Sequence, residues 1–264
     1  MIRWFEHRQV YVPSAVHDGN AADLGRPFEE AFFSAGDGVR LHGWFFPADP
    51  RSARADQVIL LLHGNAGNIS HRLGFYQVWL ETGVNVFAFD YRGYGRSEGR
   101  PSEEGTYLDA QAAYGWLRQK GFAPGNIIAL GKSLGGGIAS ELTVRETLGG
   151  LVLQSTFTSI ADVGSELFPW LPVRWANSIQ YNTHSKLPGI KIPVLVMHSR
   201  DDRLIRYHHG QKNFAAANEP KMFWEIHGHH TGVLAAGRAH YLEGLNQFLG
   251  RVDAASPVKL CEDH

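Results

Sequence analysis

The sequence predicts an α/β fold in which a mostly parallel central sheet is flanked by helices and carries a small lid insertion. Two observations lead to this class. Short apolar runs rich in Val, Ile and Leu alternate with amphipathic stretches along most of the chain. Uninterrupted apolar strands are typical of parallel sheets that are covered on both faces. The length of 264 residues suits one large domain, so we expect a single domain over residues 1–264.

The sheet is predicted to begin with an antiparallel hairpin. Phe28–Ser34 and Val39–Phe46 flank Gly36-Asp37-Gly38, which is a typical tight-turn sequence. Further strands are predicted at Val58–Leu62, Val84–Phe89, Ile127–Leu130, Leu151–Leu153, Pro193–Met197 and Met222–Ile226. Helices are predicted at about 103–119, 134–147 and 239–249, with Ser102 capping the first.

The alternation of strand and helix patterns breaks between Ser155 and Ile190. This stretch is rich in aromatic residues and contains prolines that prevent one long helix. We interpret residues 155–190 as a lid, with Phe157, Phe168 and Trp170 as candidate substrate contacts. The alternative interpretation is a helical excursion that only covers the sheet edge.

Composition excludes several classes of partner. The formal net charge of −1 gives no overall field that would attract nucleic acid. The single cysteine, Cys261, forms no internal disulfide, and the first residues lack the apolar stretch of a signal peptide. No apolar run approaches the length of a membrane span. We therefore expect a cytoplasmic protein with no integral membrane segment, and the sequence does not indicate its oligomeric state.

A candidate nucleophile stands between a predicted strand and a predicted helix. Gly131-Lys132-Ser133-Leu134-Gly135 matches the G-x-S-x-G pattern, which in this strand–turn–helix context is typical of a nucleophile elbow. Small residues two positions either side of Ser133 let the strand and helix approach closely. Serine at this position also argues against a dehalogenase, which would normally carry aspartate.

A serine hydroxyl needs a base, and the base needs an acid to orient it. Asp201 and Asp202 follow the strand that ends at Met197, and the histidines of His227-Gly228-His229-His230 follow the last strand. Spacing alone does not choose among them. The histidines could instead ligate a metal, but no carboxylate or cysteine flanks them in zinc-like spacing. We predict no metal there and no cofactor for the reaction.

Backbone N–H groups are expected to stabilise the oxyanion. The first donor is predicted to be Leu134, directly after the nucleophile. The second is predicted to be Asn65, in the glycine-containing segment His63–Asn68 after an earlier strand. We interpret His63 as a brace for this loop rather than as a base.

The sequence resembles the bud-emergence-type family of α/β-hydrolases from roughly residue 28 to residue 250, and four segments carry the resemblance. They are His63–Asn68, Asp90–Gly105, Gly131–Gly136 and Ser155–Ile160. The resemblance implies the α/β-hydrolase fold and a serine hydrolase activity. Many eukaryotic relatives carry an N-terminal membrane anchor, and this feature does not transfer to the present sequence.

The resemblance also selects the acid and the base. The family pattern His-Gly-x-x-Asp-x-x-Val/Ile-Pro lies on His198–Arg206 and implies Asp202 as the acid. The pattern Gly-x-His-Asn lies on Gly228–Thr231 and implies His230 as the base. The sequence departs from these patterns at three positions, Ser199, Arg206 and Thr231. These departures leave Asp201 and His229 as alternatives.

The predicted function is cleavage of carboxylic or thioester bonds through an acyl-enzyme on Ser133. We expect a carboxylesterase whose substrate is a small molecule with an acyl or aryl group, because the predicted lid is apolar. A serine peptidase or amidase would use the same three residues. A catalytically inactive binding module is the other alternative.

Overall fold

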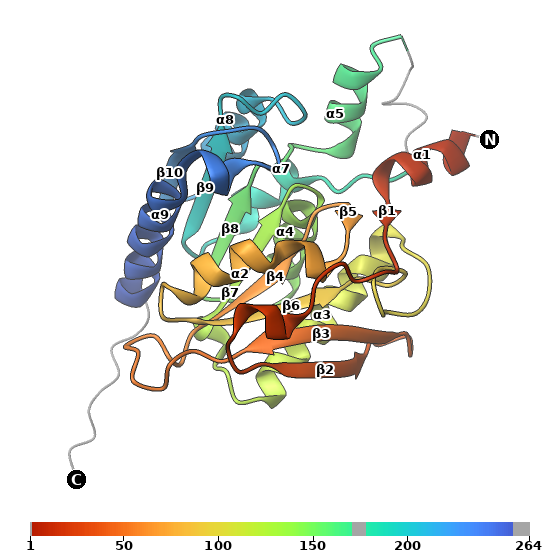
Figure 1. Cartoon of the computed structure of the whole chain (residues 1–264). Helices are drawn as coiled ribbons and strands as arrows, with labels where there is room; N and C mark the ends of the chain where they lie inside the picture. The colour runs from red at the N-terminus through yellow and green to blue at the C-terminus, as the bar shows by residue number, and fades with distance from the viewer. Residues whose placement is uncertain (1, 171–177, 256–264) are drawn as a thin grey trace.

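The computed structural model describes residues 2–170 and 178–255, and its centre is an eight-stranded sheet (Figure 1). In chain order the strands are β2 (Glu29–Ser34), β3 (Arg40–Phe46), β4 (Val58–Leu62), β6 (Asn85–Asp90), β7 (Ile127–Lys132), β8 (Gly150–Gln154), β9 (Val194–Ser199) and β10 (Lys221–Ile226). Across the sheet their order is β10-β9-β8-β7-β4-β6-β3-β2. A separate pair joins β1 (Val12–Pro13) to β5 (Ala66–Gly67).

The strand directions confirm the predicted class. Strands β6, β4, β7, β8, β9 and β10 run parallel. Strand β3 is antiparallel to both of its neighbours, β2 and β6, so the predicted hairpin is present. The carboxyl ends of all the parallel strands therefore lie along one edge of the sheet, where this kind of fold places its ligand sites.

Helices cover both faces of the sheet (Figure 1). They are α1 (Ile2–Val10), α2 (Leu73–Leu80), α3 (Glu103–Gln119), α4 (Leu134–Arg145), α5 (Ile160–Leu167), α7 (Thr183–Lys186), α8 (Tyr207–Ala216) and α9 (Val233–Ala255). The core on one face contains residues of α3 and α4, and the core on the other contains residues of α2 and α9. Successive residues of β4 alternate between them: Leu60 belongs to the first core and Leu61 to the second. This alternation explains why β4 is apolar throughout.

Local signals set several helix boundaries. Helix α3 starts after Ser102, whose side chain accepts a hydrogen bond from the Gly105 N–H, as the sequence predicts. Helix α9 starts earlier than predicted, at Val233, and has non-helical backbone angles at Gly237.

The segment predicted as a lid leaves the sheet between β8 and β9. Phe157 is buried in the core under α3 and α4. Phe168 packs edge-on against Phe5 of α1, with 6.2 Å between ring centroids. Trp170 is 73% exposed. Leu171, Pro172 and Trp175, which belong to the same apolar stretch, lie outside the described residues. A lid role for residues 155–190 stays a prediction.

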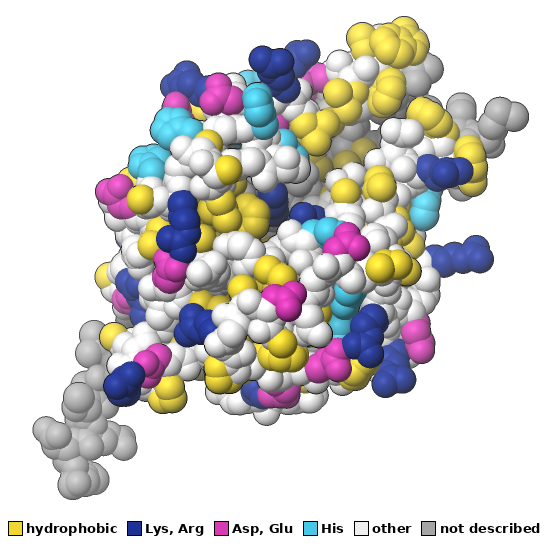
Figure 2. Space-filling model, viewed as in Figure 1, with side chains coloured by type: hydrophobic (Ala, Val, Ile, Leu, Met, Phe, Trp, Pro, Cys, Tyr) yellow, Lys and Arg dark blue, Asp and Glu magenta, His cyan; other side chains and the backbone are white. Residues whose placement is uncertain are grey.

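Apolar side chains gather on the surface over α1 and α5 (Figure 2). Trp4, Phe5 and Leu167 are exposed there together with Trp170. In the described part of the chain, no helix combines the length and the apolar character that a bilayer span requires.

Candidate active site

Ser133 occupies a strained turn between β7 and α4. Its backbone angles are φ 53° and ψ −118°, a combination that non-glycine residues rarely adopt. Its N–H donates to the Gln154 carbonyl of the neighbouring strand over 2.9 Å, and its own carbonyl accepts from the Gly136 N–H over 3.0 Å. These bonds hold Ser133 at the carboxyl end of β7, directly before the first turn of α4.

The glycines of the motif are required by close contacts. A Cβ atom on Gly135 would overlap the Leu62 carbonyl of β4, and one on Gly131 would overlap the backbone of Gly135. A Cβ on Gly136 would overlap the side chain of Thr156. Because any larger residue would push α4 away from the sheet, the sequence G-x-S-x-G-G is what allows this turn to form.

Asp202 and His230 are brought together as a hydrogen-bonded pair. His230 Nδ1 lies 2.7 Å from Asp202 Oδ2, although the residues follow different strands, β9 and β10. Asp202 Oδ1 accepts from the N–H groups of Leu204 (3.0 Å) and Ile205 (2.9 Å). Burial acts to raise the pKa of Asp202, but the hydrogen bond and the electrostatic attraction of His230 outweigh it. The pKa therefore lies below its usual value. Asp202 is thus held as a carboxylate that fixes the imidazole ring.

The alternative acid and base do not form such a pair. His229 Nδ1 lies 3.2 Å from the backbone carbonyl of Asp201, not from its carboxylate. The Asp201 carboxylate is 3.5 Å from the Gly228 N–H, at the outer limit of a hydrogen bond. His227 stacks on His240, with 5.5 Å between ring centroids. The geometry therefore favours Asp202 and His230 over Asp201 and His229.

Ser133 and His230 stand at the same edge of the sheet, since they follow the parallel strands β7 and β10. Among the described residues, Ser133 Oγ forms no hydrogen bond with His230. In enzymes of this type that hydrogen bond often forms fully only in the substrate complex.

The predicted oxyanion loop runs directly past Ser133. A Cβ placed on Gly64 would lie 3.5 Å from Ser133 Cβ. The Asn65 carbonyl is turned away and accepts from the Val12 N–H (3.0 Å) and the Tyr94 hydroxyl (2.9 Å). The Asn65 N–H has no hydrogen-bond acceptor among the described residues, and the N–H of Leu134 belongs to the first turn of α4. Both predicted donors are thus available to a bound group.

His63 is buried beneath this loop. Its Nδ1 lies 2.7 Å from the Gly64 carbonyl, and its Nε2 lies 3.5 Å from Asp90 Oδ1. Burial lowers the pKa of His63 to about 3, so the ring is neutral. These contacts suit the loop-bracing role that the sequence suggests.

Lys132 is a feature of the site that sequence reasoning missed. It is 7% exposed, and its Nζ lies 4.8 Å from the ring centroid of Phe75. Burial lowers its pKa to about 8, against an opposing attraction from the Asp202 carboxylate. The only sequence signal for a cation at this site is that a lysine stands directly before Ser133. The burial of the Lys132 side chain depends on its packing against α2.

Comparisons with known proteins agree with this architecture. The family model described as alpha/beta hydrolase fold matches residues 57–179. The chain is 36% identical over 253 residues to the uncharacterized protein Rv2307c of Mycobacterium tuberculosis, covering 94% of this chain and 89% of the relative. It is 33% identical to the alpha/beta hydrolase domain-containing protein WAV2 of Arabidopsis thaliana, covering 98% and 91%. The chain therefore belongs to the α/β hydrolase superfamily.

Two further similarities concern proteins with a named activity. The chain is 36% identical to the lysophosphatidylserine lipase ABHD12 of Danio rerio over 65% of this chain, which corresponds to 49% of that protein. The solved structure of the Pyrococcus furiosus esterase Pf2001 superposes with a TM-score of 0.77. The superposition covers 92% of this chain and 97% of that one at 21% sequence identity, and at this identity it demonstrates the shared fold alone. Hydrolase activity is the class of function that these findings support.

Proposed function

We propose that the protein is a serine hydrolase that cleaves carboxylic ester or thioester bonds through an acyl-enzyme on Ser133. Two observations carry the proposal: the strained turn at Ser133, and the hydrogen-bonded Asp202–His230 pair at the same edge of the sheet. The backbone φ of Ser133 is 53°, and the two side chains of the pair are 2.7 Å apart. We also propose that the chain falls within the bud-emergence-type family, on the four segments that resemble it.

In the proposed reaction, Ser133 Oγ attacks the carbonyl carbon while His230 Nε2 takes the hydroxyl proton. Nε2 is the acting nitrogen because Nδ1 is bonded to Asp202. The N–H groups of Asn65 and Leu134 donate to the oxyanion of the tetrahedral intermediate. His230 then delivers the proton to the leaving alcohol or thiol, and the carbonyl re-forms as the acyl-enzyme. A water molecule then attacks the acyl carbon while His230 takes a proton from it. The tetrahedral intermediate collapses, the acid is released, and Ser133 Oγ regains the proton from His230.

The substrate is proposed to be a small, uncharged acyl or aryl ester. The names of the lysophosphatidylserine lipase and the esterase to which the chain is similar support ester cleavage as such. The preference for a small, uncharged molecule rests on the apolar stretch that is predicted to be a lid. Phe157, which precedes α5, and Phe168 and Trp170, which follow it, stay the predicted substrate contacts.

The test is hydrolysis of a panel of p-nitrophenyl esters of increasing acyl length, with matched peptide anilides. We expect ester hydrolysis by the unaltered protein and a loss of about 10⁴- to 10⁶-fold in the Ser133→Ala variant. Ser140→Ala is the matched control, because Ser140 lies in the same helix and donates only to the Gly136 carbonyl over 2.8 Å. Faster cleavage of the anilides than of the esters would support a peptidase or amidase. No hydrolysis of either would support a binding module.

A further inference from the structure

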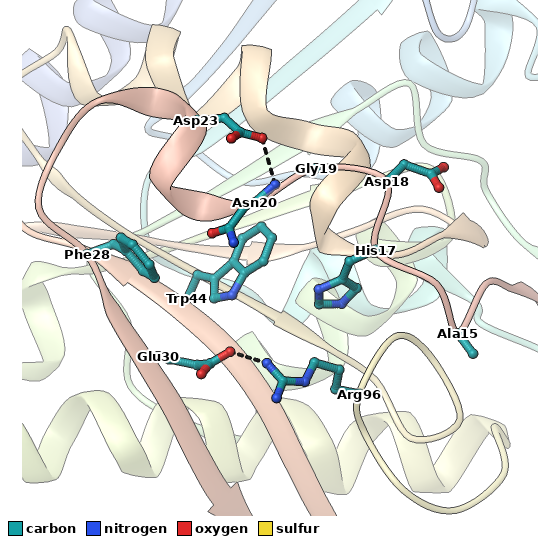
Figure 3. Close-up of a pocket in the computed structure, with 10 residues that line it drawn as sticks. All are labelled: Ala15, His17, Asp18, Gly19, Asn20, Asp23, Phe28, Glu30, Trp44 and Arg96. Carbon is teal, nitrogen blue, oxygen red and sulfur yellow. Dashed lines mark hydrogen bonds and ion pairs between the residues drawn. The ribbon is translucent and has the colours of Figure 1, made fainter.

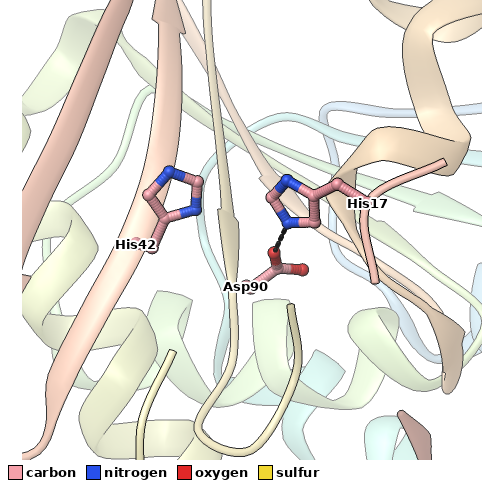
Figure 4. Close-up of side chains that lie close together, drawn as sticks. All are labelled: His17, His42 and Asp90. Carbon is pink, nitrogen blue, oxygen red and sulfur yellow. Dashed lines mark hydrogen bonds and ion pairs between the residues drawn. The ribbon is translucent and has the colours of Figure 1, made fainter. Parts of the chain in front are cut away.

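Three potential metal ligands from separate segments meet outside the candidate active site. His17 comes from the segment after β1, His42 from β3, and Asp90 from the end of β6. One ligating atom of each lies within 4.8 Å of the other two. Figure 4 shows the two imidazole rings facing each other, with the Asp90 carboxylate beside them. We propose that His17, His42 and Asp90 bind a divalent transition-metal ion such as Zn²⁺, which ties the N-terminal segment to the sheet.

The strongest evidence for the metal site comes from the surroundings of His42. Its side chain is fully buried, and its Nε2 lies 2.9 Å from Glu30 Oε1. A carboxylate can only accept, so the proton of the neutral ring is on Nε2 and the Nδ1 lone pair is bare. Nδ1 is buried and has no hydrogen-bond partner among the described residues.

The Glu30–His42 contact is what a metal-ligating histidine usually makes. Such a histidine donates its second N–H to a carboxylate or carbonyl, which fixes both the tautomer and the ring orientation. Glu30 also pairs with Arg96. The ring is therefore held in place before any ion arrives, with its bare nitrogen facing the other two ligands.

His17 and Asp90 have the spacing of two ligands on one ion. His17 Nε2 lies 3.3 Å from Asp90 Oδ2. Two ligands at about 2.0–2.1 Å from a tetrahedral Zn²⁺ are about 3.3 Å apart, whereas a charge-assisted hydrogen bond is usually about 2.7–2.9 Å. The ligand atom of His42 lies no more than 4.8 Å from the other two, so a side-chain shift of at most about 1.5 Å brings it to the spacing of a shared Zn²⁺ shell.

Asp90 is a buried carboxylate with no lysine or arginine as an ion-pair partner among the described residues. Its carboxylate is fully buried, and among the described residues its ion-pair partners are only the histidines His17 and His63. A carboxylate in a fully buried position is costly unless a cation or hydrogen bonds compensate its charge. A divalent cation would remove this cost, because it places a full positive charge next to Oδ2.

The site has an entrance from solvent. His17 lines a surface cavity of about 670 Å³ together with Trp44, Glu30 and Arg96 (Figure 3). On another side the site is closed by Gly95, where an added Cβ would overlap Asp90 Oδ2. An ion can therefore arrive through the cavity, and a water molecule there would complete a four-coordinate shell. The two imidazoles favour Zn²⁺, Co²⁺ or Ni²⁺ over Mg²⁺ or Ca²⁺.

The ion would have a structural role, because the site adjoins the buried His63 and none of its three ligands contacts Ser133, Asp202 or His230 among the described residues. Asp90 Oδ1 accepts from the Ile69 N–H over 2.9 Å and lies 3.5 Å from His63 Nε2. A metal on Oδ2 would fix the position of the carboxylate that accepts from Ile69. We therefore expect metal binding to stabilise the fold.

The chain offers a built-in control. Glu166, His208 and His209 form a second group with metal-ligand chemistry. There, however, both histidines already contact one carboxylate oxygen, with distances of 2.9 and 3.2 Å to Glu166 Oε1. His208 belongs to this second group and not to the proposed site, so a His208→Ala variant should leave metal binding at His17, His42 and Asp90 intact.

The experiment uses the full chain without a histidine tag, freed of metal with a chelator and titrated with ZnCl₂ by calorimetry. We expect one high-affinity equivalent and a higher melting temperature in its presence. His17→Ala should abolish that equivalent, and Glu30→Gln should weaken it by about 10- to 100-fold. His17 is partly exposed, so this variant is expected to fold even where a change at the buried His42 would not.

Substitution with Co²⁺ gives an independent readout, since its visible absorption reports a tetrahedral nitrogen and oxygen shell. That spectrum should disappear in His17→Ala and persist in His208→Ala. The proposal is overturned if the unaltered protein takes up no Zn²⁺. It is equally overturned if uptake survives His17→Ala or is lost in His208→Ala. None of these readouts depends on hydrolysis, so they separate this site from the function proposed for Ser133.

Discussion

Replacing Lys132 by Met should stabilise the protein at neutral pH. The side chain is 7% exposed, and burial lowers its pKa from 10.5 to about 8. At about 1.4 kcal/mol for each pH unit between these values, the buried charge lowers the free energy of unfolding by about 3 kcal/mol at pH 7. Loss of the contact between the ammonium group and the Phe75 ring offsets this by about 1 kcal/mol. The expected net gain for Lys132→Met is therefore about 2 kcal/mol.

The pH dependence of this gain has a definite sign. The folded pKa of Lys132 lies below the unfolded value, so the unfolded chain binds more protons between pH 8 and pH 10.5. The destabilisation caused by the charged Lys132 therefore decreases as the pH rises through this window, and the free energy of unfolding increases. The advantage of the Met variant should shrink from pH 7 to pH 10.5.

Urea unfolding followed by tryptophan fluorescence at both pH values measures the difference directly. Lys212→Met is the matched control, because Lys212 is exposed on α8, and its effect should stay within about 0.5 kcal/mol. A Lys132→Met variant that is less stable than the unaltered protein at pH 7 would refute the reasoning. A gain that does not change with pH would refute it as well.

Three further predictions concern the candidate site. Asp202→Asn should lower kcat by about 10⁴-fold with the fold intact, because the amide no longer orients the imidazole, while Asp201→Asn should change ester hydrolysis little. His230→Ala should abolish hydrolysis, whereas His229→Ala should not. Steady-state kinetics on one p-nitrophenyl ester compares the two variants. A larger loss of activity in His229→Ala would instead identify His229 as the base. Gly135→Ala should destabilise the protein by about 3 kcal/mol or more, because its Cβ would overlap the Leu62 carbonyl; a melting temperature equal to that of the unaltered protein would contradict this contact.

Much of the sheet could be predicted from the sequence because its strands are apolar and of strand length. Strand β4 has the predicted bounds, Val58–Leu62, and the predicted hairpin is present as β2 and β3. Helices α1, α2, α5, α7 and α8 were not predicted. None of them is longer than ten residues, so each offers too few turns for a periodic pattern to stand out in the sequence.

The candidate site could be predicted only in part. The elbow at Ser133 has a local signal, since glycine spacing and the strand–helix context define it. The pairing of Asp202 with His230 needed the family resemblance, because spacing alone left Asp201 and His229 open. Tertiary packing buries Lys132, and it also brings His17 next to His42 and Asp90. Neither arrangement has a local signature in the sequence.

The central claim is that Ser133 is the nucleophile. Fluorophosphonate labelling followed by peptide mapping of the intact chain tests it most directly, because the reagent forms a stable covalent bond only with an activated serine. The account predicts a single adduct on the peptide that contains Ser133. It also predicts no adduct in Ser133→Ala and a large loss of labelling rate in His230→Ala. A stable adduct on another residue, or unchanged labelling of Ser133→Ala, would contradict it.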